Sequence, residues 1–300
     1  MSIEAVRAWR SGWVLRSACR LDRALRRARI ESLAPVRALR SVSKRLLLQA
    51  FAADDRLILA EVEGHPMFIP RRFVNHYILK KFEPLTAALF RQAIRRGSVV
   101  LDIGAHVGFY SLLAAREAGP EGHVFAFEPG PDNFPVLQRN LHLNGNRNVS
   151  AVRLAAGAEV TRRTLLLSDS SDLHGFYPNP FSPASRGSWP VRCVTVDSFL
   201  GTRLGDGVKM DVEGAEPEVL AGMRATLASG RRLVLFVEMS PACLRAAGHS
   251  PADLLGILMD AGFSVAWIEE RAGRIVPVPS REFVPSQDTF GYANLYCVRN

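Results

Sequence analysis

The sequence lacks an uninterrupted apolar run of about 18 residues, so it predicts no helix that spans a membrane. Its four cysteines are scattered, with no CxxC pair and no spacing typical of a metal site. Reduced thiols in a cytoplasmic protein are the simplest interpretation. No internal repeat is visible either. With 48% hydrophobic residues, the 300-residue chain can bury a proper core, in one large domain with an appendage or in two domains.

Most of the chain also lacks an excess of charge. Residues 51–300 hold 26 basic and 26 acidic residues, so the formal net charge of +9 arises in residues 1–50, where 12 basic residues face 3 acids. That segment carries an apolar stripe at helical spacing between its arginines: Val6, Trp9, Trp13, Leu21, Leu25 and Ala28. A basic amphipathic helix favours peripheral contact with an anionic membrane, at its inner face. The alternative is a helical extension packed on the body. The neutral body argues against nucleic acid as a partner.

The chain divides into a basic amphipathic extension (1–50), a hairpin and helix module (51–98) and a larger domain (99–300). In the module, Arg56–Val62 and Met67–Pro70 are predicted to be two strands of a hairpin. A helix that opens near Pro84 and stops at Gly97 has its proline and glycine where helix ends favour them.

From residue 99 onward, strand and helix patterns alternate. The expected strands are 99–103, 123–127, 149–155, 208–212, 232–237, 264–268 and 295–298, and the expected helices lie near 107–118, 131–143, 216–228 and 251–261. This alternation predicts an α/β fold with a doubly wound, mostly parallel seven-stranded sheet, Rossmann-like, with helices on both faces. A polar stretch, Ser168–Pro190, interrupts it and is predicted to be a loop.

The most informative stretch is Val99–Ala115, VVLDIGAHVGFYSLLAA. An apolar run containing Asp102 leads into a turn with Gly104 and Gly108, and a helical pattern follows. In an α/β domain, such a strand, turn and helix form a ligand-binding crevice. The next apolar run ends in Glu128, an acid well placed to hold the two hydroxyls of a ribose. The sequence therefore predicts a nucleoside-binding turn.

The turn lacks the middle glycine that a G-x-G-x-x-G motif needs to close on a pyrophosphate, because Ala105 follows Gly104. Asp102 suits a ligand with a cationic amino group better than one with phosphates. Both features favour S-adenosylmethionine. Two alternatives are an NAD-dependent oxidoreductase or epimerase, and a membrane-docked binding module with a non-catalytic cofactor site.

Four segments carry a resemblance to a known family: VLDIGAHVGFYS, FEPGPDNFPVLQRNLHLNG, VTVDSFL and VKMDVEGAEPEVLAGM. Over about residues 56–300 the chain resembles the FkbM-type methyltransferases, and the DVEGAE block is the most specific part. The resemblance implies a class I, S-adenosylmethionine-dependent enzyme. Members of the family mostly methylate hydroxyls on sugars, glycolipids, polyketides or other secondary metabolites.

The same resemblance implies which residues line the cofactor. Asp102, Gly104, Ala105 and Gly108 would line its methionine end, Glu128 would hold the ribose, and Ala155, Ala156 or Gly157 would lie beside the adenine. His106 stands where the family more often has asparagine. Either side chain can form hydrogen bonds.

Three carboxylates are the catalytic candidates. Asp211 and Glu213 follow one strand and Glu238 ends the next, at the edge where open α/β sheets bind ligands. One of them could act as the general base that takes the proton of an acceptor hydroxyl. A bound divalent cation is an alternative, but no further ligand pattern appears, so no metal is predicted. Hydrogen bonding to loop backbone is a third interpretation. Glu216 is expected in the first turn of the following helix.

The polar stretch between Ser168 and Pro190 is interpreted as the loop that binds the acceptor, since loops of this length in compact domains are often functional. His174, Tyr177 and Trp189 lie in it or beside it. An ordinary surface excursion is the alternative. The acceptor is expected to be a small-molecule or glycan hydroxyl.

Overall fold

The structure, a computed structural model, describes residues 56–79, 82–182, 185–203, 205–283 and 291–299. The basic helix expected within residues 1–50, with its contact to a membrane, lies outside these residues. The described residues belong to two units, one up to Phe82 and one from Glu83 onward. Within them, no helix combines the length and the apolar character that crossing a bilayer requires.

The smaller unit is a β-hairpin followed by short helical turns. Its elements are β1 (Leu57–Val62), β2 (His65–Pro70), the 3-10 helix η1 (Arg71–Phe73) and the π-helix η2 (Asn75–Leu79). Glu63 and Gly64 connect the strands with positive φ angles of 47° and 84°, as a tight hairpin turn requires. Alternate residues of β1 are buried, from Ile58 to Val62. The predicted hairpin is confirmed.

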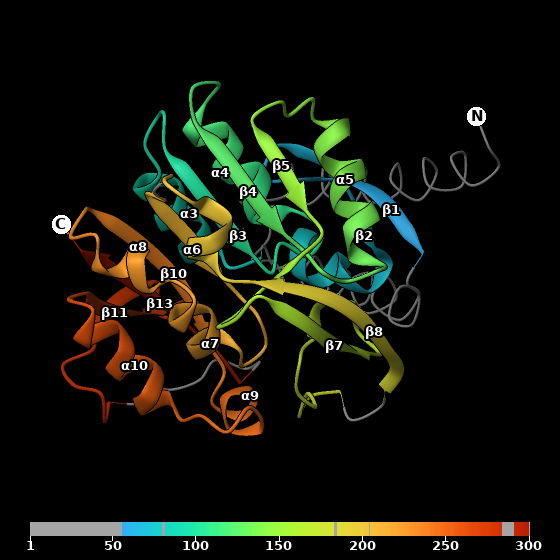
Figure 1. Ribbon diagram of the computed structural model, residues 1–300. Helices are drawn as coiled ribbons and strands as arrows, with labels where there is room; N and C mark the ends of the chain where they lie inside the picture. The colour runs from blue at the N-terminus through green and yellow to red at the C-terminus, as the bar shows by residue number, and fades with distance from the viewer. Residues whose placement is uncertain (1–55, 80–81, 183–184, 204, 284–290, 300) are drawn as a thin grey trace, which may run out of the picture. The chain divides into compact units, whose positions relative to one another are not determined.

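The larger unit is built on an eight-stranded sheet in the order β12-β11-β13-β10-β9-β3-β4-β5 (Figure 1). Its strands are β3 (Val99–Ile103), β4 (His123–Phe127), β5 (Val149–Val152), β9 (Gly207–Met210), β10 (Leu233–Met239), β11 (Ser264–Glu269), β12 (Arg274–Pro277) and β13 (Ala293–Arg299). The five strands β10, β9, β3, β4 and β5 run parallel to one another. Strand β13 pairs antiparallel with β10 and β11, and β11 pairs antiparallel with β12. The prediction of a doubly wound, mostly parallel sheet is confirmed. The expected strand count of seven missed β12, which is mostly exposed and carries no apolar alternation.

Helices cover the sheet on both faces. They are α3 (Pro84–Ala93), α4 (Phe109–Ala118), α5 (Asn133–Leu143), α6 (Val196–Leu200), α7 (Glu216–Ala221), α8 (Arg224–Ala228), α9 (Pro241–Ala246) and α10 (Pro251–Asp260). The prediction of a single helix over 216–228 is wrong, because the helix is interrupted between α7 and α8, at Gly222. The backbone of Gly222 packs closely on Gly157: an added Cβ would lie 2.1 Å from the carbonyl oxygen of Gly157. Helix α3, predicted to accompany the hairpin, belongs to the larger unit.

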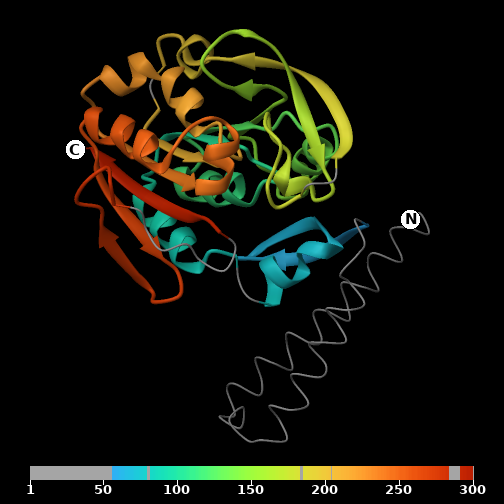
Figure 2. The same cartoon turned by 90° about the horizontal axis from the view of Figure 1, so that it is seen from below.

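The polar stretch forms more regular structure than predicted. Strands β6 (Ala155–Ala156), β7 (Thr161–Ser168) and β8 (Ser185–Val194) make a separate three-stranded sheet, with a 3-10 helix, η3 (Ser171–Leu173), between β7 and β8. In both views, β7 and β8 form a ribbon beside the main sheet (Figures 1 and 2). The prediction that the loop extends to Pro190 is therefore wrong, because β8 already begins at Ser185. The first half of β8 is exposed, but it pairs with the apolar end of β7 and is ordered by that pairing. We call residues 157–194 the insertion.

The described cysteines agree with the expectation of reduced thiols. Cys193, Cys243 and Cys297 are buried and free, while Cys19 lies outside the described residues. Burial raises the pKa of each of these three thiols above its ordinary value. A raised thiol pKa lowers the thiolate fraction, so none of the three is an activated nucleophile.

Candidate functional site

Asp102 lies inside β3 and points into the protein interior, where it is almost fully buried. The Ser111 hydroxyl donates a hydrogen bond to Asp102 Oδ2 at 2.5 Å. Burial raises the pKa of Asp102 to about 6, although this hydrogen bond partly opposes the shift. Asp102 therefore links β3 to α4 beneath the turn.

The turn after β3 is held against both neighbouring strands. The backbone N–H groups of Gly104 and Ala105 donate to the carbonyl oxygen of Phe127, at the end of β4, over 3.0 and 2.8 Å. On the other side, a Cβ added to Gly104 would lie 1.8 Å from the carbonyl oxygen of Asp211. Gly108 is the N-terminal cap of α4. The turn thus joins the ends of β4 and β9 at one edge of the sheet.

Glu128 lies at this same edge, buried beside the turn. Its Oε2 accepts from the backbone N–H of His106 at 2.7 Å, and its Oε1 accepts from that of Gly130 at 2.8 Å. Burial is the largest effect on this carboxyl and raises its pKa to about 7, against these hydrogen bonds. His106 adopts a left-handed φ of 49°, and its Nε2 lies 3.1 Å from Ser171 Oγ. The predicted ribose acid is therefore next to the predicted turn.

Ala155 and Ala156 lie beyond the end of β5, which stops at Val152 rather than at the predicted residue 155. They form the short strand β6, whose backbone pairs with β8. Both side chains are buried in apolar clusters. Their predicted place beside an adenine stays a prediction.

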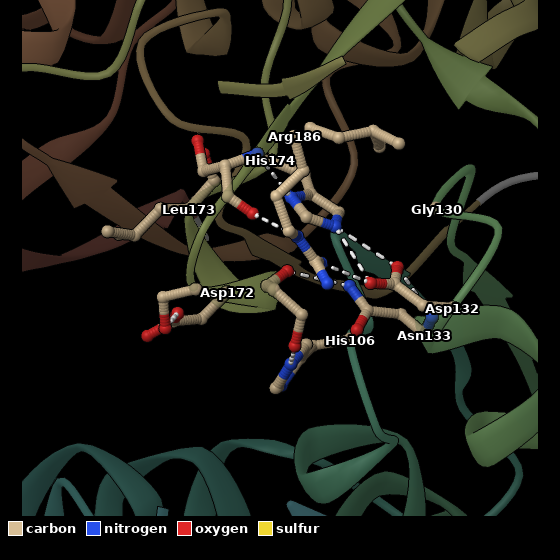
Figure 3. Close-up of polar contacts among 12 residues, drawn as sticks. His106, Gly130, Asp132, Asn133, Asp172, Leu173, His174 and Arg186 are labelled. Atoms are coloured by element: carbon tan, nitrogen blue, oxygen red, sulfur yellow. Dashed lines mark hydrogen bonds and ion pairs between the residues drawn. The ribbon is translucent and has the colours of Figure 1, made fainter. Parts of the chain in front are cut away.

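The insertion is attached to the start of α5, next to Glu128. His174 Nε2 lies 3.0 Å from Asp132 Oδ1, and Arg186 Nη2 donates to Asp132 Oδ2 at 2.7 Å (Figure 3). Although partial burial opposes it, the hydrogen bonds from His174 and Arg186 hold the pKa of Asp132 well below its usual value. Asn133 Nδ2 donates to the carbonyl oxygen of Ser171 at 2.8 Å. With the contact between His106 and Ser171, these bonds hold η3 beside the turn that follows β3.

A second set of contacts attaches the insertion to α7. Arg163 and the Tyr177 hydroxyl both contact the carboxylate of Glu218, and the Arg163 guanidinium lies 3.8 Å from the centre of the Phe176 ring. In a further contact of the insertion, Asn179 Nδ2 donates to Glu213 Oε2 at 2.8 Å. Sequence reasoning missed the partners of Glu218 and Glu213, since they lie 34 or more residues away in the chain and no local pattern links them.

The three predicted carboxylates come together at the ends of β9 and β10. One carboxylate oxygen from each of Asp211, Glu213 and Glu238 lies within 4.8 Å of the others. Glu213 is held in the left-handed region, with φ 54°. A non-glycine residue in this region carries backbone strain, which is often found at functional sites. We call these three residues the carboxylate cluster.

A buried lysine accompanies the cluster. Lys209, in β9, is 1% exposed, and its Nζ lies 3.3 Å from Asp211 Oδ2. Burial alone would lower the pKa of this ammonium, but Asp211 and Glu83 outweigh it and raise the pKa. Burial and the neighbouring Asp211 raise the pKa values of Glu213 and Glu238 well above 4.5. One signal in the sequence could have identified Lys209, since it is a charged residue inside an otherwise apolar strand.

Glu83 and Glu216 have structural roles. The Tyr110 hydroxyl donates to Glu83 Oε2 at 2.5 Å, and Asn294 Nδ2 donates to its Oε1 at 2.7 Å. Glu216 begins α7 as predicted, and its Oε1 accepts from the backbone N–H groups of Val212 and Gly214. Bonding to loop backbone was one interpretation of the three predicted carboxylates, but it is Glu216 that forms such bonds and so fixes the loop that carries Asp211 and Glu213.

The geometry places a nucleoside-type turn, a buried acid and three carboxylates at the carboxyl ends of four neighbouring parallel strands. A model of the methyltransferase FkbM domain matches residues 102–265. The hexuronic acid methyltransferase AglP of Haloferax volcanii is 28% identical over 185 residues, which cover 59% of this chain and 67% of AglP. The 31-O-demethyl-FK506 methyltransferase FkbM of Streptomyces tacrolimicus is 36% identical over 89 residues, covering 29% of this chain and 33% of that protein. A solved SAM-dependent methyltransferase from Aquifex aeolicus aligns with a TM-score of 0.40 at 14% identity, over 72% of this chain and 90% of that one.

Proposed function

Because the chain belongs to the FkbM family of S-adenosylmethionine-dependent methyltransferases, we propose that it methylates a hydroxyl oxygen of a sugar, a glycolipid or another secondary metabolite. The observation that carries this proposal is the carboxylate cluster beside the cofactor turn. An alcohol is a weak nucleophile at neutral pH, so a hydroxyl acceptor needs a group that promotes loss of its proton. Two relatives, named for a hexuronic acid and for 31-O-demethyl-FK506, fit an acceptor of this kind.

The residues of the turn suit the cofactor. Glu128 presents a buried carboxylate, an acceptor that two ribose hydroxyls can share. The turn offers no third glycine for a pyrophosphate, which disfavours a dinucleotide. When bound, S-adenosylmethionine supplies a methyl group already activated on a sulfonium. We assign its binding to Asp102, Gly104, Ala105, His106, Gly108, Glu128, Ala155 and Ala156.

The remaining catalytic work falls to the chain itself. The carboxylate cluster would contact the acceptor hydroxyl and promote loss of its proton, with Asp211, Glu213 and Glu238 as the catalytic residues. The insertion would hold the acceptor and exclude water, since its two attachments place Asn179 against Glu213. Correct placement of two reactants is itself a large part of catalysis.

The proposal predicts transfer of a methyl group to oxygen. The full chain, incubated with S-adenosylmethionine and a panel of hexuronic acids, glycolipids and polyols, should yield S-adenosylhomocysteine and a product one methyl group heavier. The new bond should survive mild alkali, as an ether does. A product that loses its methyl group in alkali would be a carboxyl ester and would contradict the proposal, as would a methyl group on nitrogen.

The pKa of Glu128, raised to about 7, predicts how cofactor affinity depends on pH. Ribose hydroxyls donate more strongly to an ionised carboxylate, so protonation of Glu128 competes with binding. S-adenosylhomocysteine should bind about tenfold more weakly at pH 6 than at pH 8, by isothermal titration calorimetry. Glu128→Gln should bind weakly at both pH values, whereas the exposed control Glu159→Gln should keep the wild-type profile. The same pH dependence in Glu128→Gln would remove the ribose assignment.

A further inference from the structure

The carboxylate cluster has the arrangement of a metal site with open positions. We propose that Asp211, Glu213 and Glu238 bind one divalent cation of the Mg²⁺ or Mn²⁺ class, and that the acceptor hydroxyl binds to this cation. This inference rests on the proposed function, since it names the group that promotes loss of the hydroxyl proton. It also decides between the base and the cation that the sequence left as alternatives.

The distances fit a small hard cation. One oxygen from each carboxylate lies within 4.8 Å of the other two, and opposite oxygens of an octahedral Mg²⁺ site are about 4.2 Å apart. Each residue has an oxygen to give. Lys209 engages Asp211 Oδ2, and Asn179 and Cys243 engage Glu213 Oε2. The oxygens Asp211 Oδ1 and Glu213 Oε1 therefore remain for a cation.

Glu238 supplies an observation independent of the clustering. Its side chain is 8% exposed, and no residue in the described part of the chain donates a hydrogen bond to its carboxylate. Buried carboxylates are otherwise hydrogen-bonded, paired with a cation or bound to a metal. One of its oxygens faces those of Asp211 and Glu213. A buried carboxylate that no described residue hydrogen-bonds, directed at two others, indicates a ligand between them.

The charges point the same way. Among the described residues, the three carboxylates share one nearby cation, Lys209, and this lysine also faces Glu83 and Asp102. Its single positive charge cannot balance the cluster, and a divalent cation would offset most of the remaining negative charge. Carboxylate ligands select Mg²⁺ or Mn²⁺ over softer metals. The three residues fill three coordination positions of an octahedral ion, so its remaining coordination positions stay open for water and the acceptor oxygen.

A cation bound to the carboxylate cluster would make the acceptor hydroxyl easier to deprotonate. A bound hydroxyl becomes more acidic because the metal stabilises the negative oxygen that remains. The O–H bond breaks, its electron pair stays on oxygen and the proton passes to a water molecule. The insertion contacts the cluster through Asn179, which donates to Glu213. Asn179 would thereby fix the orientation of one metal ligand, as partners of metal ligands commonly do.

Mn²⁺ binding tests the inference without any methyl acceptor. The full chain, freed of metal with a chelator, should bind one Mn²⁺ per molecule in electron paramagnetic resonance titrations. Glu238→Gln keeps the shape of the side chain but removes its charge, and should weaken Mn²⁺ binding at least tenfold. The exposed control Glu159→Gln should bind Mn²⁺ like the wild type. Glu238→Gln should still bind S-adenosylhomocysteine, which shows that it is folded.

Two results would overturn the inference: no Mn²⁺ binding by the wild type, or equal Mn²⁺ affinity in Glu238→Gln. Asp211→Asn gives a second variant, with its thermal melt as the check on folding. Methyl transfer should stop with a chelator and return with Mg²⁺ or Mn²⁺. Transfer to a hydroxyl that persists in the chelator would refute the metal and leave the proposed function intact. Tight Mn²⁺ binding without methylation of any hydroxyl would refute the proposed function and support the cation site alone.

Discussion

Lys209→Met should lower the free energy of unfolding by about 3–5 kcal/mol, because it leaves buried carboxylates without their cation. The ammonium of Lys209 lies 3.3 Å from Asp211 Oδ2 and also faces Glu83 and Asp102. Methionine fills a similar volume, so the loss would reflect charge and not a cavity. In a domain of this size the melting temperature should fall by roughly 10 °C. Urea unfolding of the full chain would measure the free energy directly.

The pH dependence separates this explanation from a simple packing defect. Burial raises the pKa of Asp102 to about 6 and raises that of Glu83. Both are more protonated in acid and then need the lysine less, so Lys209→Met should lose less stability at pH 5 than at pH 8. The double variant with Asp211→Asn should lose less than the sum of the two single variants, as expected for groups in contact. Strict additivity, or an equal loss at both pH values, would show that the lysine does not neutralise these acids.

Gly104→Ala should reduce methyl transfer by about a hundredfold or more and weaken binding of S-adenosylhomocysteine. An added Cβ would lie 1.8 Å from the carbonyl oxygen of Asp211, a distance that forces backbone to move. The residue that moves is Asp211, one of the proposed catalytic carboxylates, and a displacement of about 1 Å in a reactive group costs about a hundredfold in rate. Gly104 also has φ 86°, which alanine tolerates poorly.

Gly97→Ala is the matched control for Gly104→Ala. Gly97 has a similar φ of 79°, but a Cβ there would meet no atom within 4 Å. Its substitution should cost about 1–2 kcal/mol of stability through backbone strain alone. Cofactor affinity and the rate of methyl transfer should be unchanged. If both variants lose activity alike, strain at a left-handed glycine would explain the result, and the contact with Asp211 would be irrelevant.

The elements predicted most accurately from sequence are those with strong local signals. Strands β3, β4 and β10 were predicted from their apolar runs. The turn between Asp102 and Gly108 was predicted from its two glycines and from the acid that precedes them. The parallel sheet then implied that Asp211, Glu213 and Glu238 would share one edge, because neighbouring parallel strands end at the same side. The exposed strand β12 and the first half of β8 carry no apolar alternation, so they were missed.

The sequence by itself determined the fold class, the nucleoside-type turn and the strand ends at which acids gather, since each depends on residues near one another in the chain. Only the tertiary structure decided which acids have partners. It brought Glu83 and Asp102 near Lys209 and attached the insertion through Asp132. It also placed Glu238 beside two other carboxylates, with no hydrogen-bond donor among the residues that the structure describes. Burial and charge balance depend on what packs around a group, and those neighbours come from segments that the chain brings together only when it folds.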